Sequence, residues 1–161
     1  MPSDPLFAGM FTEAKAREAV SGRAWLQAML DFEAALAEAE ASLGLVPESH
    51  AALVREVCRA ELFDIGTLGE EAAHAANPAG PLVEALRAKV PAEAAGSVHL
   101  GATSQDALDT AMMLVAQRAG VHVLRWLAEA GGLAAALAKD HADLAMAGRT
   151  LLQQAVPVTF G

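Results

Sequence analysis

The sequence predicts an all-α protein, with a helical N-terminal domain over residues 1–102 and the first long helix of a helix-bundle domain over 103–161. Alanine, leucine, glutamate and arginine dominate the chain, and these residues favour helices. No stretch alternates apolar and polar residues for long enough to predict a sheet. The third observation is a long apolar pattern of helical period after residue 104. With 161 residues, of which 54% are hydrophobic, the chain can bury a sizeable core.

The first elements are a short helix over 12–20 and a long helix over 23–43. Ser21 is a good N-cap for the long helix, because its hydroxyl oxygen can accept a hydrogen bond from a free backbone N–H of the first turn. Gly44 is the expected residue just past the C-terminal end. An apolar stripe predicts the buried face of this helix, and it consists of Trp25, Met29, Phe32, Leu36 and Leu43.

Shorter helices are predicted to follow, over 47–60, 65–76 and 82–89. Pro47 fits the first turn of the first of them, since proline lacks an N–H that is unpaired there in any case. Asp64 is a candidate N-cap for the second helix. The segment Asn77–Pro81 should break the chain before the third helix, and Pro91 should stop that helix.

The longest periodic pattern predicts a helix from Gln105 to about Asp140, roughly 50 Å long at 1.5 Å per residue. Thr103 and Asp106 form a capping-box pattern at its start. A second apolar row flanks the main stripe, as in helices that lie inside a bundle. Since no other predicted helix is long enough to cover this one, we expect partner helices from other chains or from further sequence. The main stripe is Leu108, Met112, Val115, Ala119, His122, Trp126, Ala130, Leu133 and Leu137.

Composition excludes several classes of protein. A formal net charge of −9 argues against nucleic acid and anionic membranes as partners. No apolar run approaches the roughly 20 residues of a membrane span, and the N-terminus has no signal-peptide pattern, so we expect a cytoplasmic protein. The single cysteine, Cys58, excludes an internal disulfide and a multi-cysteine zinc site. We expect neither a metal nor a cofactor.

The strongest candidate site is the segment His99–Asp106. Thr103, Ser104 and the free amides of the first helical turn are donors at the positive end of a long helix dipole, which suits a carboxylate or phosphate. The alternative is an ordinary N-cap, in which the hydroxyls bond to the helix itself. Asp106 opposes an anion unless it is paired. His99 is either a proton donor and substrate contact or a structural residue.

A second candidate group lies near the C-terminal end of the sequence. Arg149 and Gln153 are polar residues in apolar surroundings, and together they could hold a carboxylate by charge and amide donation. Spacing alone does not decide this.

Both segments resemble known signature sequences. Residues 99–110 and 148–161 are similar to the first and second signature regions of the fumarase/aspartase superfamily. The resemblance to one branch of that superfamily, the lactone-forming cycloisomerases, extends to other segments. These are Leu6–Phe7, residues 26–36, and Asn77–Pro78 followed by Pro81–Val83. The resemblance covers essentially the whole chain.

The resemblance implies a homotetramer with a central bundle of long helices, and active sites where three subunits meet. It also implies that the substrate is a small dicarboxylate or tricarboxylate. In the reaction, a group adds across a double bond of the substrate or is eliminated to form one. Residues of the second signature would reach the site from a neighbouring subunit. The implied catalytic residues are His99, Ser104 and Thr150, and the implied substrate-binding residues are Asn77, Thr103, Ser104, Gln105, Arg149 and Gln153.

One position departs from many lyases of the superfamily, which carry a catalytic histidine where this chain has Leu151. The cycloisomerase branch also lacks that histidine, so Leu151 favours this branch and leaves the proton donor unassigned. The alternatives are a lyase acting on a succinyl adduct, similar to adenylosuccinate lyase, and a non-catalytic helical assembly module. The third signature, a mobile serine-bearing loop, would lie beyond Gly161, so we expect these 161 residues alone to be inactive.

Overall fold

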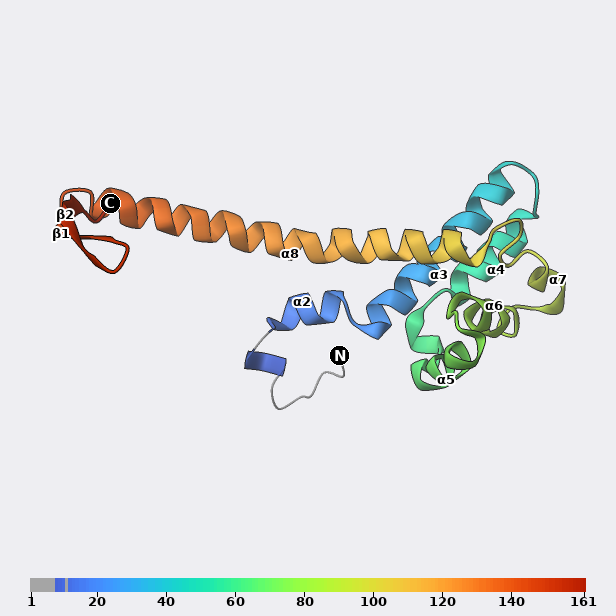
Figure 1. Cartoon of the computed structure of the whole chain (residues 1–161). Helices are drawn as coiled ribbons and strands as arrows, with labels where there is room; N and C mark the ends of the chain where they lie inside the picture. Colours follow the sequence, from blue (N-terminus) through green and yellow to red (C-terminus); the bar gives the residue numbers. More distant parts are fainter. Residues whose placement is uncertain (1–7, 11) are drawn as a thin grey trace. The chain divides into compact units, whose positions relative to one another are not determined.

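The computed structural model describes residues 8–10 and 12–161, so Leu6–Phe7 lie outside the described residues. The chain divides into two compact units, the first reaching Ala119 and the second covering Gly120–Gly161. Figure 1 shows helices over most of the chain and one pair of short strands near the C-terminus, which confirms the predicted helical fold class. The predicted domain boundary at residues 102 and 103 stays a prediction.

Helices α2 (Ala14–Ala19) and α3 (Gly22–Ser42) follow the sequence prediction closely. Ser21 caps α3 as predicted, and its side chain accepts a hydrogen bond from the backbone N–H of Ala24 at 3.2 Å. Gly44 adopts a φ of +72°, a left-handed conformation that glycine enters without steric strain.

Short elements complete the small helical region: α4 (Glu48–Val57), the 3-10 turn η1 (Ala60–Leu62), α5 (Ile65–Ala75), α6 (Ala79–Arg87) and α7 (Ala92–Ala95). Asp64 caps α5 as predicted, through a 2.7 Å hydrogen bond from the backbone N–H of Thr67. The prediction that Asn77–Pro81 breaks the chain was too long, because α6 already begins at Ala79. Pro81 is tolerated there, since backbone N–H groups of the first turn have no partner within a helix.

The core of the first unit lies between α3, α4 and α6. Its largest fully buried side chains include Leu30, Val54, Leu82, Leu86 and Val98. The predicted buried stripe of α3 was only partly right: Met29 is buried, but Leu43 is 75% exposed. The buried face of α3 is displaced around the helix from the predicted stripe. Its buried residues are Leu26, Ala28, Met29, Leu30, Glu33, Ala37 and Glu40.

Helix α8 covers Ser104–Asp140, which confirms the predicted long helix to within one residue at its start. Its buried residues are Ala107, Ala111 and Val115, all within the first unit. There Arg118 also forms an ion pair with Asp31 of α3 at 2.5 Å. Beyond residue 119 most apolar side chains of the helix are exposed, among them Val121, Val123, Leu124, Leu127, Leu133 and Leu137.

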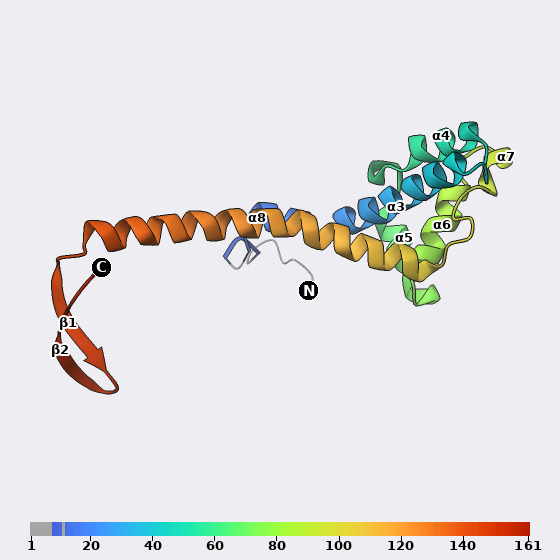
Figure 2. The ribbon, with the colours of Figure 1, turned by 90° about the horizontal axis from the view of Figure 1, so that it is seen from above.

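A β-hairpin ends the described chain, and the sequence analysis did not predict it. Strand β1 (Ala145–Thr150) pairs antiparallel with β2 (Gln153–Thr159), as Figure 2 shows. The register shifts between Ala147 and Arg149. A Cβ at Gly148 would lie 2.4 Å from the carbonyl oxygen of Val156, so only glycine fits this irregular position. Among the described residues, no helix has both the length and the apolar character to cross a membrane.

Candidate active site

The segment between α7 and α8, together with the first turn of α8, carries four of the eight predicted site residues: His99, Thr103, Ser104 and Gln105. It contains two left-handed backbone positions, His99 at φ +58° and Gly101 at φ +69°. Glycine adopts this conformation freely, whereas a residue with a Cβ is strained there by roughly 1–2 kcal/mol. His99 must therefore be held in place by its surroundings.

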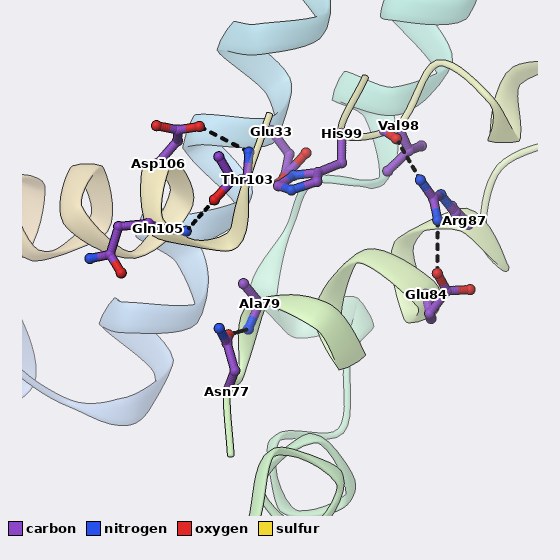
Figure 3. Close-up of polar contacts among 10 residues, drawn as sticks. All are labelled: Glu33, Asn77, Ala79, Glu84, Arg87, Val98, His99, Thr103, Gln105 and Asp106. Carbon is purple, nitrogen blue, oxygen red and sulfur yellow. Dashed lines mark hydrogen bonds and ion pairs between the residues drawn. The ribbon is translucent and has the colours of Figure 1, made fainter. Parts of the chain in front are cut away.

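The ring of His99 is held by a hydrogen bond to Glu33, a residue on the buried face of α3. Its Nδ1 lies 2.6 Å from Oε1 of Glu33, and the two side chains are only 12% and 1% exposed. Figure 3 shows the ring pointing from its loop toward this carboxyl group. Burial raises the pKa of Glu33 above its ordinary value, and the hydrogen bond and charge of His99 oppose that rise.

Thr103 forms the predicted capping box at the start of α8. Its Oγ1 accepts a hydrogen bond from the backbone N–H of Gln105 at 3.1 Å. Its own backbone N–H donates to Oδ2 of Asp106 at 2.9 Å. The ordinary N-cap is thus present, and it uses two backbone donors that an anion would otherwise find. The hydroxyl hydrogen of Thr103 remains available for donation, because the oxygen acts as the acceptor in the cap.

Ser104 and Gln105 differ in whether their side chains already have hydrogen-bond partners. Ser104 is half-buried, and within the described residues neither its hydroxyl nor its backbone N–H has a hydrogen-bond partner. Gln105 donates its side-chain amide to Oδ1 of Asp109 at 2.6 Å, along the exposed side of the helix. Ser104 is therefore the residue of this turn best prepared to donate to a ligand.

Asn77 has a local role in the structure. Its Oδ1 accepts a hydrogen bond from the backbone N–H of Ala79 at 2.8 Å and so fixes the first turn of α6. The Nδ2 group is left for a ligand. Its predicted part in substrate binding stays a prediction.

The other predicted residues lie in the second unit, at the tip of the hairpin. Thr150 pairs with Gln153 and Arg149 pairs with Gln154. Directly opposed residues share one face of a two-stranded sheet, and successive residues alternate between the faces. Thr150 and Gln153 therefore project to one face and Arg149 to the other. Leu151 and Leu152 form the turn, where Leu152 has a φ of +61°.

Two cavities of the first unit do not suit a substrate carrying several carboxylates. One cavity of about 610 Å³ lies beside α3 and the start of α8, but Glu40, Asp106 and Asp109 give its wall negative charge. A second, of about 360 Å³, is lined almost wholly by apolar groups. Within the described part of the chain, no three metal-binding side chains come together.

Comparison with known proteins identifies the family. A family model described as lyase matches residues 5–161, almost the whole chain. The chain belongs to the fumarase/aspartase family of lyases. The predicted resemblance is thereby confirmed.

The individual relatives are longer proteins, and the chain spans only about a third of their length. It is 48% identical to the 3-carboxy-cis,cis-muconate cycloisomerase of Pseudomonas aeruginosa, over 100% of this chain and 36% of that protein. It is also 48% identical to the nitrosuccinate lyase of Streptomyces davaonensis, over 98% of this chain and 33% of that protein. The crystal structure of the 3-carboxy-cis,cis-muconate lactonizing enzyme from Pseudomonas putida matches with a TM-score of 0.95 and 46% identity, over 97% of this chain and 36% of that one.

Glu33 is the residue of the candidate site that the sequence analysis missed. One signal was present in the sequence: Glu33 lies four residues after Met29 and four before Ala37, so a carboxylate occupies a position on an apolar helix face. A buried carboxylate needs a partner, and the partner here is a residue of the first signature.

Proposed function

We propose that the protein of which this chain is part is a cycloisomerase that converts 3-carboxy-cis,cis-muconate to carboxymuconolactone in the catabolism of aromatic compounds. The observation that supports this most strongly is that almost the whole chain matches the sequence of one such enzyme and the crystal structure of another. The cytoplasm is the compartment we propose for it.

The proposed reaction is the intramolecular addition of a carboxylate oxygen to a carbon–carbon double bond. A C–O bond forms, the electron pair of the double bond moves toward a neighbouring carboxylate as an enolate-like anion, and a proton then adds to carbon. Donors fixed around that carboxylate stabilise the developing charge, each by about 3–4 kcal/mol in comparable oxyanion sites. Ser104 and Thr103 are the donors we propose from this unit, with Thr150 and Gln153 from the hairpin. Arg149 is a weaker candidate.

We further propose that the protein assembles as a homotetramer around α8. The exposed apolar residues of this helix beyond residue 119 support the proposal, because a continuous apolar stripe is stable in water only when it is covered. Residues 103–161 would then open the bundle domain. The hairpin would act in the site of a neighbouring subunit.

A second candidate is a lyase that eliminates a group from a substituted succinate. The chain is as similar to a nitrosuccinate lyase as to a cycloisomerase, at 48% identity to each, so its sequence identity does not separate the two activities. Both reactions pass through a carboxylate-stabilised anion, and the same donors would serve either one.

The deciding experiment assays the full-length protein on 3-carboxy-cis,cis-muconate, nitrosuccinate and adenylosuccinate. We expect turnover of the muconate, followed as loss of the absorbance of its conjugated diene. Turnover of nitrosuccinate or adenylosuccinate alone would replace the proposal with a lyase. Inactivity toward every unsaturated or substituted dicarboxylate would favour the non-catalytic assembly module.

Variants of the capping turn test the residues. Ser104→Ala should lower kcat by about 10²-fold, as expected for loss of one oxyanion donor. Thr103→Ala should lower activity and also destabilise the fold by about 1 kcal/mol, because it removes an N-cap. Thr103→Ser keeps both the cap and the hydroxyl, so it should retain activity. Unchanged turnover in Ser104→Ala would exclude that residue from the site.

A further inference from the structure

Glu33 is the carboxylate on the buried face of α3 that contacts a predicted site residue. Its side chain is 1% exposed, and its Oε1 is hydrogen-bonded to Nδ1 of His99. Its second oxygen, Oε2, is buried without a hydrogen-bond partner among the described residues. A carboxylate placed in this way is expensive to bury, so a role in folding stability alone explains it poorly.

The pair restricts His99 in two ways. When the Glu33 carboxyl group is ionised it can only accept hydrogen bonds, so the ring nitrogen that meets it then carries a hydrogen. The ring is also fixed in orientation, because Phe32 of the same helix meets it edge-on with 6.4 Å between the ring centroids. Arg87 and Glu40 are the other charged side chains whose fields act on Glu33.

The free nitrogen of His99 is thereby defined. Nε2 has no hydrogen-bond partner among the described residues, and His99 lies four positions before Thr103 in the segment that carries the proposed carboxylate donors. The same arrangement, an acidic residue that orients a histidine through Nδ1 and leaves Nε2 for chemistry, sets the tautomer in enzymes with a carboxylate–histidine pair.

We propose that Glu33 is a positioning residue for the active site: it holds the Nδ1 hydrogen of His99, fixes the ring, and leaves Nε2 to contact the substrate. The effect on turnover rests on the proposed function. The protonation of the ring and its orientation do not, and they are measured separately.

The first test reads the ring directly by NMR. In the intact protein labelled with ¹⁵N at histidine, Nδ1 of His99 should carry a hydrogen near neutral pH, and its signals are assigned by their absence from His99→Asn. Glu33→Gln, whose amide can either accept or donate, should shift the distribution of the hydrogen between the two nitrogens. An Nδ1 without hydrogen in the wild-type protein, with the hydrogen on Nε2, overturns the proposal whatever the enzyme's substrate.

The second test separates positioning from a structural role. Glu33→Gln should lower kcat at least about 10-fold while changing KM little, as losses of orienting partners do. Glu40→Gln is the matched control, since it removes another buried carboxylate of α3 that has no hydrogen bond to His99, and it should keep kcat within about 2-fold of the wild type. Equal kcat values for the two variants would overturn the proposal.

His99→Asn completes the set. Asparagine can keep a donor near the position of Nδ1, and with it the hydrogen bond to Glu33, but it lacks Nε2. We expect a melting temperature close to that of the wild type and a loss of kcat. If His99→Asn keeps full kcat, the pair serves only to hold the loop, and the assigned role of Nε2 is wrong.

Discussion

The two segments that resemble family signatures are built in opposite ways. The first, residues 99–110, is held by the interior of its own unit through the hydrogen bond between His99 and Glu33, and Val98 just before it has a side chain that is 1% exposed. The hairpin Ala145–Thr159 exposes nearly all its side chains, with Leu151 at 85% and Leu152 at 98%. The first segment is preorganised by its own chain. The second presents apolar groups that only another surface could bury.

Helix α8 shows the same contrast along its length. Its first residues, including Ala107, Ala111 and Val115, are buried in the core of the first unit. Farther along, Leu124, Leu127 and Leu133 are each more than 60% exposed. The apolar stripe of α8 is therefore buried within the chain at its N-terminal end only. The exposed remainder is consistent with the assembly proposed above.

The largest test of this contrast compares two leucines. Leu30 is 0% exposed and Leu152 is 98% exposed. In this chain, Leu30→Ala should reduce the free energy of unfolding by about 3 kcal/mol, because it leaves a cavity in the core. Leu152→Ala should change it by less than about 0.5 kcal/mol. Denaturant titration measures both.

The outcome for Leu152 also bears on the assembly. A similar loss of stability in the two variants would show that the hairpin tip is covered in solution, and the contrast between the segments would fail. A dependence of that loss on protein concentration would identify the cover as a second copy of the chain.

A smaller, local effect is expected inside the hairpin. Gly148→Ala places a Cβ against the carbonyl oxygen of Val156, so opening of the hairpin should become easier by about 1–3 kcal/mol. Hydrogen exchange of the β1 and β2 amides measures this opening. Gly131→Ala is the matched control, since its Cβ would meet nothing within 4 Å, and alanine should stabilise that turn of α8 by up to about 1 kcal/mol. Unchanged exchange in Gly148→Ala would exclude the tight approach at the bulge.

Features set by local chemistry were predictable from the sequence. The caps at Ser21, Asp64 and Thr103 depend on side-chain oxygens within three residues of the amides they accept from, and the structure contains all three. The length of α8 follows in the same way from an apolar period that persists over many turns.

What the sequence analysis missed depends on contacts that are remote along the chain or on an irregular strand. The hairpin escaped prediction because Gly148 and Pro157 interrupt the alternation that marks strands, and because its bulge shifts the alternation by one residue. Glu33 escaped because its partner, His99, lies 66 residues away. A pattern search within a helix reveals an acid on an apolar face, but it does not reveal the group that the acid meets.

The smallest expected effect concerns the pH dependence of stability. Because burial raises the pKa of Glu33 in the folded state, its carboxyl group favours folding most at pH values below its ordinary pKa. That contribution is lost as the pH rises through the raised pKa. Glu33→Gln has no such titration, so its melting temperature relative to the wild type should rise from pH 4 toward neutral pH. A melting-temperature difference for Glu33→Gln that falls with pH would mean that the charge of His99, rather than burial, controls this carboxyl group, and that the interior of the first segment is held together as an ion pair.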